Sequence, residues 1–274
     1  MAQSTALQIS KLRVGFFGVG VMGEALMASI VHAGVTPNQI NFCEKRDERA
    51  IEIAERYGAR RSSLEETATT SNLIFLVVKP QDLGELILSL APHLPLDSLL
   101  VSFAAGKSTH FIEARLIAAQ AVVRVMPNTP VLIGQGMSVL SAGAHASADH
   151  LALISELLST SGSVMYIDES LQDAVTAVSG SGPAYFFAFI EAMVAGGVAL
   201  GLSSEVATEL SIQTIIGAAA MLAESGKSAT TLRENVTSPN GTTAAALNRF
   251  SQGHLSELVA GAMTAARDRS QELA

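Results

Sequence analysis

The chain has 274 residues, a formal net charge of −8 and one cysteine, Cys43. Its length suits one large domain or two modest ones, and its acidic balance argues against a nucleic-acid partner, because nucleic acid needs a basic face. One cysteine forms no internal disulfide and the first residues lack a secretory signal, so we expect a reducing, cytoplasmic location.

The first predicted element is a strand that runs into three glycines. The residues F-F-G-V-G-V-M-G, 16–23, form a G-x-G-x-x-G pattern between this strand and a predicted helix. In dinucleotide-binding proteins the first glycine allows a tight turn, the second lets the backbone approach the pyrophosphate, and the third lets the helix pack closely. The free amides at the helix start then face the phosphates. The predicted dinucleotide-binding residues of this loop are Gly18, Val19, Gly20, Val21, Met22 and Gly23.

Runs of apolar and β-branched residues alternate with helical segments over about the first 165 residues. The runs show little polar alternation, which is typical of parallel strands covered on both faces. Strand–helix alternation also predicts right-handed crossovers, so we expect an α/β domain with a doubly wound, mainly parallel Rossmann sheet. The predicted strands are residues 12–17, 40–43, 73–78, 99–103, 122–126, 137–140 and 164–167. The predicted helices are residues 21–33, 47–57, 81–90, 109–119 and 148–160.

Three further loops follow predicted strands. In an open parallel sheet, ligands lie at the carboxyl ends of the strands. Proline and glycine end strands in many proteins, so one such loop would be ordinary, but three at the edge of the glycine loop favour a nucleotide groove. The residues of interest are Val78, Lys79 and Pro80; Ala104, Ala105 and Gly106; and Asn128 within residues 126–130.

Charged residues follow the second strand and bear on the choice of cofactor. An acid at this place, here Glu44, holds the ribose hydroxyls of NAD, whereas a base, here Lys45 or Arg46, favours the 2′-phosphate of NADP. Both kinds are present, and the two bases also suit a solvated helix start. All three residues are therefore candidate cofactor contacts.

After residue 168 the pattern becomes helical throughout, which divides the chain into a domain of residues 1–168 and an all-α domain of residues 169–274. Candidate N-caps are Ser203 or Ser204 for one helix and Asn240 for another. The predicted helices are residues 169–178, 183–200, 204–225, 242–251 and 255–272.

One helix of this second domain is unusually apolar. The chain is 49% hydrophobic and only 15% charged, and the surplus is concentrated in residues 185–202. That segment is almost long enough to span a bilayer, but Glu191 lies near its middle, where a carboxylate is costly. We expect it to be buried in a subunit interface, and a membrane-associated interaction protein is the alternative.

Polar loops offer the remaining candidate chemistry. Residues 235–243, N-V-T-S-P-N-G-T-T, precede a helix and present hydroxyls and free amides that suit a small carboxylate, although a plain capping loop has the same composition. Residues 179–185, S-G-S-G-P-A-Y, are either a helix entry or backbone packed on a ligand. The six histidines lie apart without metal-ligand spacing, so we expect no metal.

Six motifs follow one another in the chain: G-V-G-V-M-G, V-K-P, A-A-G, M-P-N-T-P, D-A-V-T-A-V-S-G-S-G-P-A-Y and V-T-S-P-N-G-T-T. In this order, and over nearly the whole chain from Arg13, they resemble the pyrroline-5-carboxylate reductase family, which makes the last step to proline. The resemblance implies a Rossmann domain followed by a helical dimerisation domain that interlocks with a second copy, and dimers that assemble into decamers. It places the active site between the cofactor domain and the partner's helical domain.

The resemblance further implies hydride transfer from NAD(P)H to C5 of the cyclic imine 1-pyrroline-5-carboxylate, giving L-proline. The nicotinamide is expected along residues 104–106 and 126–128. The substrate loop is expected to hold the carboxylate with Ser238, Asn240, Gly241 and Thr242, and it also includes Asn235 and Val236. Thr243 matches the family threonine whose hydroxyl approaches the ring nitrogen, which makes it the candidate catalytic proton donor. The family more often uses NADPH, which is expected here with NADH as the alternative.

Two places differ from the family pattern. Asn240 stands where the family has the first glycine of S-P-G-G-T-T, and Ser228-Ala229 replaces a common His-Pro pair. Three alternative functions remain: another imine reductase, a β-hydroxyacid-type dehydrogenase and a non-catalytic NADP-binding sensor. The predicted helix over residues 183–200 contains no lysine, which argues against the dehydrogenase.

Overall fold

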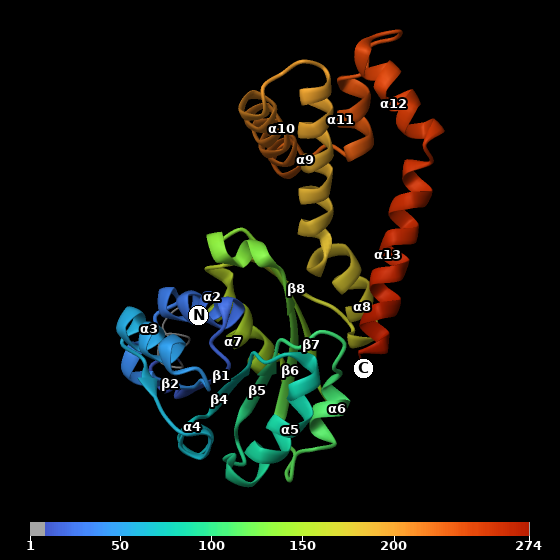
Figure 1. Cartoon of the computed structure of the whole chain (residues 1–274). Helices are drawn as coiled ribbons and strands as arrows, with labels where there is room; N and C mark the ends of the chain where they lie inside the picture. The colour runs from blue at the N-terminus through green and yellow to red at the C-terminus, as the bar shows by residue number, and fades with distance from the viewer. Residues whose placement is uncertain (1–8, 274) are drawn as a thin grey trace. The chain divides into compact units, whose positions relative to one another are not determined.

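The structure, a computed structural model, describes residues 9–273 and divides into two compact units (Figure 1). The sheet unit contains the described residues up to Ser181 together with those from Ala266 onward, and the helical unit is Gly182–Ala265. By contacts, residues 169–181 therefore group with the sheet unit. The predicted boundary between residues 168 and 169 stays a prediction.

The sheet unit is built on one sheet of eight strands in the order β3-β2-β1-β4-β5-β6-β7-β8. All neighbouring strands are parallel except β6 and β7. This confirms the predicted α/β fold with a mainly parallel sheet, while the short β3 was not predicted. The strands are β1 (Val14–Phe17), β2 (Ile40–Cys43), β3 (Arg60–Arg61), β4 (Leu73–Leu76), β5 (Leu99–Ser102), β6 (Ala121–Pro127), β7 (Gly136–Ala142) and β8 (Gly162–Tyr166).

Apolar side chains cover both faces of the sheet, which explains the absence of polar alternation in its strands. Every residue of β1, β4 and β5 is buried. On one face Phe75 stacks on Phe16 and Phe103, with ring centroids 4.8 and 5.4 Å apart, beneath α2, α3 and α7. On the other face Ile74, Leu76 and their neighbours pack against α4, α5 and α6.

The helices of this unit begin and end close to their predicted limits, with two exceptions. The predicted helix over residues 109–119 ends at Glu113, because the chain must turn to enter β6 at Ala121, and α4 was not predicted. The larger helices are α2 (Val21–His32), α3 (Asp47–Tyr57), α4 (Leu64–Thr70), α5 (Pro80–Leu90), α6 (Thr109–Glu113) and α7 (Ala148–Ser159). Short helical turns are η1 (Pro37–Gln39), η2 (Ala91–His93), η3 (Thr129–Ile133), η4 (Glu169–Leu171), α8 (Gln172–Val175) and the π-helical η5 (Thr176–Gly180).

The helical unit contains α9 (Gly182–Ala199), α10 (Ser204–Glu224), α11 (Ala229–Asn235), α12 (Thr242–Gln252) and most of α13 (Leu255–Glu272). Ser203 caps α10 by accepting a hydrogen bond from the Val206 amide, as predicted. The predicted cap at Asn240 is wrong: Gly241 is the N-cap of α12 and Asn240 takes a left-handed conformation, with φ of 58°. The short helix α11 was not predicted, and Ser228 caps it.

Large apolar side chains of the helical unit remain exposed. Phe186, Phe187 and Met193 on α9 and Leu210 and Ile216 on α10 are among them. Two described segments, Glu169–Ala199 and Ser204–Glu224, are long and apolar enough to cross a membrane by length and composition alone. A dimer interface needs the same apolar surface.

Candidate functional site

The three glycines of the motif differ in what surrounds them: Gly18 and Gly20 lie between β1 and α2, and Gly23 lies in the first turn of α2. Gly18 has φ of +94°, and a Cβ there would overlap the carbonyl oxygen of Val77; a Cβ at Gly23 would overlap the carbonyl oxygen of Gly18. A Cβ at Gly20 would meet no protein atom within 4 Å. The first and third glycines therefore serve the turn and the helix packing, whereas the protein itself gives no steric reason for the second. Open space at Gly20 is what the close approach of a pyrophosphate requires.

The start of α2 is free to bind an anion. Gly20 is its N-cap, and no side chain caps this end of the helix. The first amides of a helix lack intrahelical acceptors and carry a partial positive charge. Val21, the first residue of the helix, is exposed, and Val19 is buried beneath the loop. The glycine loop therefore leaves Gly18 and Gly20 half-buried and directs the Val19 side chain into the core.

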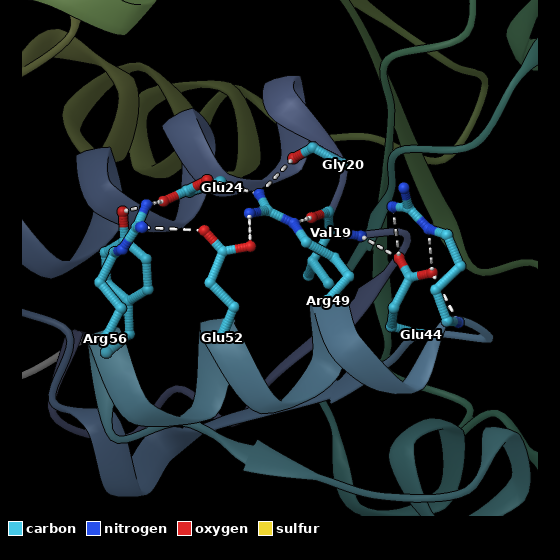
Figure 2. Close-up of polar contacts among 9 residues, drawn as sticks. Val19, Gly20, Glu24, Glu44, Arg49, Glu52 and Arg56 are labelled. Carbon is cyan, nitrogen blue, oxygen red and sulfur yellow. Dashed lines mark hydrogen bonds and ion pairs between the residues drawn. The ribbon is translucent and has the colours of Figure 1, made fainter.

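Glu44 lies directly after β2 and reaches toward the glycine loop (Figure 2). Its carboxylate accepts hydrogen bonds from the Val19 amide at 3.4 Å and from the amide and Nε of Arg46, both at 3.0 Å. Burial alone would raise the pKa of Glu44, but the hydrogen bonds from Arg46 and Val19 hold it below its ordinary value. Glu44 is therefore ionised and already paired, while Lys45 and Arg46 are exposed.

The V-K-P loop begins beside the first glycine. The Val77 amide donates to the Phe17 carbonyl at 2.9 Å, and the Val77 carbonyl lies against Gly18. Lys79 is exposed at the N-cap of α5, and Pro80 is the first residue of that helix. Pro80 suits this position because its ring fixes a helical φ and the first helical amide needs no partner. The loop and the glycine loop therefore lie at the same edge of the sheet, as predicted.

Gly106 in the A-A-G loop is needed by the chain's own C-terminal segment. It has φ of +74°, and a Cβ there would lie 2.5 Å from the Ser270 carbonyl oxygen and 2.7 Å from the Leu273 Cβ. Ala104 is buried and Ala105 is half-buried. The sequence pattern predicts only a nicotinamide contact for this glycine and gives no sign of this packing, because the contacting residues follow more than 160 positions later in the chain.

The side chain of Asn128 is engaged by the protein at both ends. Its Oδ1 accepts from the Met137 amide at 2.8 Å, and its Nδ2 donates to the Ser179 hydroxyl at 3.3 Å. A Cβ at Gly180 would overlap the terminal methyl of Met126. The M-P-N-T-P and S-G-S-G motifs therefore pack on each other in the sheet unit. The π-helical turn η5 lies at this contact, a geometry that is often found at functional sites.

The polar loop of residues 235–243 lies in the helical unit, between α11 and α12. Asn235, Val236, Ser238, Asn240 and Thr242 are exposed. Gly241 and Thr243 are half-buried, the Gly241 amide donates to the Ser238 carbonyl at 3.0 Å, and no side chain caps α12. A Cβ at Gly241 would lie 2.5 Å from the Ser238 hydroxyl. The loop therefore leaves the first amides of an 11-residue helix open beside two threonine hydroxyls.

Sequence reasoning missed the charged side chains that hold the glycine loop from behind. Arg49 donates a hydrogen bond to the Val19 carbonyl of the loop, and it pairs with Glu24 in the first turn of α2.

Among residues 9–273 no group of three His, Cys, Asp or Glu side chains is placed to hold a metal ion. The absence of a metal from the reaction stays a prediction.

Comparison with known families identifies both parts of the chain. Residues 169–273 match the family described as pyrroline-5-carboxylate reductase dimerisation, and residues 13–106 match NADP oxidoreductase coenzyme F420-dependent. The chain is 42% identical to the pyrroline-5-carboxylate reductase of Pseudomonas aeruginosa, covering 97% of this chain and 98% of that protein. It is 39% identical to the pyrroline-5-carboxylate reductase of Corynebacterium melassecola, over 95% of this chain and 98% of that protein.

Solved structures agree with these relatives. The pyrroline-5-carboxylate reductase of Coxiella burnetii superposes with a TM-score of 0.88 at 32% identity, covering 96% of this chain and 98% of that one. The pyrroline carboxylate reductase of Plasmodium falciparum with NADP bound gives a TM-score of 0.85 at 29% identity, with the same coverage. These similarities extend over both units.

Proposed function

The chain belongs to the pyrroline-5-carboxylate reductase family and is an NAD(P)H-dependent enzyme of proline biosynthesis that binds NADP; from that premise we propose which of its residues carry the reaction. The open space at Gly20, beside the uncapped start of α2, is the observation that supports dinucleotide binding at the glycine loop. The loops of residues 78–80 and 104–106 and the backbone at Asn128 extend this site toward the nicotinamide. We place no metal in the reaction.

The substrate carboxylate is proposed to lie at the start of α12. The free amides of Thr242 and Thr243 and the hydroxyls of Ser238 and Thr242 offer hydrogen bonds to an anion. Asn240 supports this geometry, because its left-handed backbone replaces the glycine that such a turn often uses. Asn235 and Val236 form the exposed entrance of the loop.

Thr243 is proposed to contact the ring nitrogen of the imine. When bound, the reduced nicotinamide supplies a hydride to C5 of the substrate, and the electron pair of the C=N bond moves to the nitrogen. The Thr243 hydroxyl passes its proton to that nitrogen and regains one from solvent, so that the product is a secondary amine, while the helix amides keep the carboxylate fixed. Orientation and charge stabilisation of this kind account for much of the rate enhancement in enzymes.

Replacing Thr243 tests this assignment. Thr243→Val is expected to lower kcat by about 100-fold, the size of a lost proton-transfer contact, and Thr243→Ser is expected to restore most of it. The rate of NADPH oxidation at saturating pyrroline-5-carboxylate measures the effect. Thr230→Val, on exposed α11, is the matched control. Unchanged turnover in Thr243→Val would exclude the threonine as proton donor.

We propose that the chain prefers NADPH over NADH. A free acid after β2 would repel a 2′-phosphate, but Glu44 is paired with Arg46, whose side chain is 65% exposed. Lys45 adds a second exposed cation at the same place. The ratio of kcat/KM for the two nicotinamides measures the preference, and a ratio in favour of NADH would assign Glu44 to the ribose hydroxyls instead.

The dimerisation family that matches residues 169–273 implies a homodimer. We propose that the two copies interlock through the exposed apolar faces of α9 and α10 rather than meeting a bilayer, that dimers assemble into decamers, and that the enzyme is cytoplasmic. Sedimentation of the full chain without detergent tests this. Ten copies in one particle would support the decamer, and a need for detergent would support the membrane.

A further inference from the structure

The Val19 peptide, between the first two loop glycines, is held at both of its polar groups by charged side chains (Figure 2). Its amide donates to Glu44 at 3.4 Å, and its carbonyl accepts from Arg49 Nε at 2.8 Å. Both charged residues come from the β2–α3 segment. Arg49 also donates from Nη2 to the Gly20 carbonyl at 3.4 Å. One guanidinium therefore binds two successive carbonyls of the glycine loop.

Arg49 is itself fixed by acidic residues on two helices. It forms ion pairs with Glu24, in the first turn of α2, and with Glu52 on α3, the latter at 2.6 Å. Glu24 also pairs with Arg56 and accepts from the Tyr57 hydroxyl at 3.2 Å. The cluster of Glu24, Arg49, Glu52 and Arg56 carries no net charge. Its effect on a bound anion is therefore through geometry, since two acids offset two bases.

Fixing a carbonyl also fixes the amide that follows it. In a planar trans peptide the C=O of one residue and the N–H of the next point in opposite directions. When Arg49 holds the carbonyl of Val19 on the α3 side, the amide of Gly20 must point away from α3. The Gly20 carbonyl also accepts the first helical hydrogen bond of α2, from the Glu24 amide at 2.9 Å, so the helix itself sets the Val21 amide. Both amides belong to the uncapped start of α2, where Gly20 leaves open space.

We propose that Arg49 is a positioning residue that aims the Gly20 amide at the pyrophosphate of the dinucleotide, with Glu24 holding its guanidinium in place. This rests on the proposed function of the glycine loop. Arg49 acts from behind the loop, where its donors are taken up by Val19, Gly20, Glu24 and Glu52. Its loss is therefore expected to weaken dinucleotide binding without changing the substrate loop.

The test compares two arginines of the same cluster. Arg49→Met removes the hydrogen bonds to the loop carbonyls. Arg56→Met removes a partner of Glu24 and Glu52, but native Arg56 does not contact the loop, so no bond to the loop is lost. The dissociation constant for NADPH is measured from its own fluorescence, in a chain without tryptophan. Arg49→Met is expected to weaken binding by about 10- to 100-fold, as for lost hydrogen bonds to a charged group. Arg56→Met is expected to stay within about twofold.

Kinetics separate positioning from general destabilisation. In Arg49→Met the KM for NADPH is expected to rise with its dissociation constant, while kcat and the KM for pyrroline-5-carboxylate at saturating NADPH stay close to wild type. Arg49→Lys keeps the charge but cannot bind both carbonyls as a fork, so its binding is expected to lie between wild type and Arg49→Met. If Arg49→Met does not fold, Arg49→Lys decides: binding equal to wild type would overturn the proposal.

A third variant separates this inference from the function on which it rests. Gly20→Val fills the open space and is expected to abolish NADPH binding. If Gly20→Val binds NADPH normally, the glycine loop is not the dinucleotide site and the proposed function fails. If Gly20→Val loses binding but Arg49→Met binds as tightly as Arg56→Met, the site stands and the role of Arg49 is wrong.

Discussion

The two units differ in how far they bury their phenylalanine side chains. In the sheet unit Phe75 is 0% exposed and stacks within a continuous core, whereas in the helical unit Phe187 is 64% exposed on α9. A helix that is apolar around its whole circumference belongs inside a larger core. The sheet unit therefore completes its core within one chain, whereas the helical unit leaves apolar side chains exposed, and we propose that a second copy covers them, in keeping with the dimerisation match.

A charge on the exposed face of α9 is expected to have the largest effect, because it tests whether the helical unit needs a second copy. Phe187→Asp is expected to dissociate the dimer and to lower activity by more than about 100-fold, because an unpaired carboxylate cannot be buried in an apolar interface. Light scattering and NADPH oxidation measure the two effects. Leu88→Asp on α5, where the native side chain is 60% exposed, is the control and should stay dimeric and active. An active, dimeric Phe187→Asp would place the interface elsewhere.

A cavity in the core of the sheet unit is expected to lower the stability of the fold without affecting the dimer interface. Phe75→Ala removes a buried ring that stacks on Phe16 and Phe103, and is expected to cost about 3–5 kcal/mol of unfolding free energy. Denaturant unfolding at several protein concentrations measures it. The loss should be independent of concentration, unlike that of an interface variant. A concentration-dependent loss would mean that the sheet unit also depends on the partner.

The smallest expected effect concerns Glu24 and pH. Burial would raise the pKa of Glu24, but hydrogen bonds and attraction from Arg49 and Arg56 lower it below the ordinary value. The folded pKa then lies below the unfolded one, so ionised Glu24 stabilises the fold above the unfolded pKa and loses that effect as pH falls through the folded pKa. Glu24→Gln should therefore be less stable than wild type at pH 7, and the difference should shrink below about pH 4.

Chemical unfolding of both proteins between pH 7 and pH 3 checks this dependence. Glu66→Gln serves as the comparison, because its ion pair with Arg60 is exposed and contributes little at any pH. A Glu24→Gln difference that stays constant down to pH 3 would show that the carboxylate charge is not what stabilises the cluster.

Local patterns were sufficient to predict most of the sheet unit. The apolar run of residues 40–43 predicts a strand with the same bounds as β2. The motif spacing predicts that Gly18 allows the turn and that Gly23 allows close helix packing, and in the structure a Cβ at either residue would overlap a backbone oxygen. The same patterns predicted α3 and α13 with their observed limits. The assignment of individual site residues to cofactor and substrate stays a prediction.

Long-range contacts explain what the sequence did not reveal. Arg49 reaches the carbonyls of Val19 and Gly20 across about 30 positions, and nothing in D-E-R-A-I-E marks that arginine as different from its neighbours. Helix α11 begins with A-T-T-L, whose β-branched threonines have low helix propensity. Asn240 contributes a left-handed backbone conformation to its loop and does not cap α12. Arg49 thus depends on distant partners, whereas α11 and Asn240 depart from the residue preferences that helices and helix caps usually follow.

The sheet unit is discontinuous in sequence, and this has a consequence for synthesis on the ribosome. Domains made first usually fold first, but here Gly106 packs against Ser270 and Leu273, and Asp173 accepts a hydrogen bond from the Ser270 hydroxyl at 2.8 Å. The sheet unit is therefore closed by residues that are made long after its last strand, β8. A nascent chain stopped near residue 181 would contain all eight strands and still lack the segment that seals them.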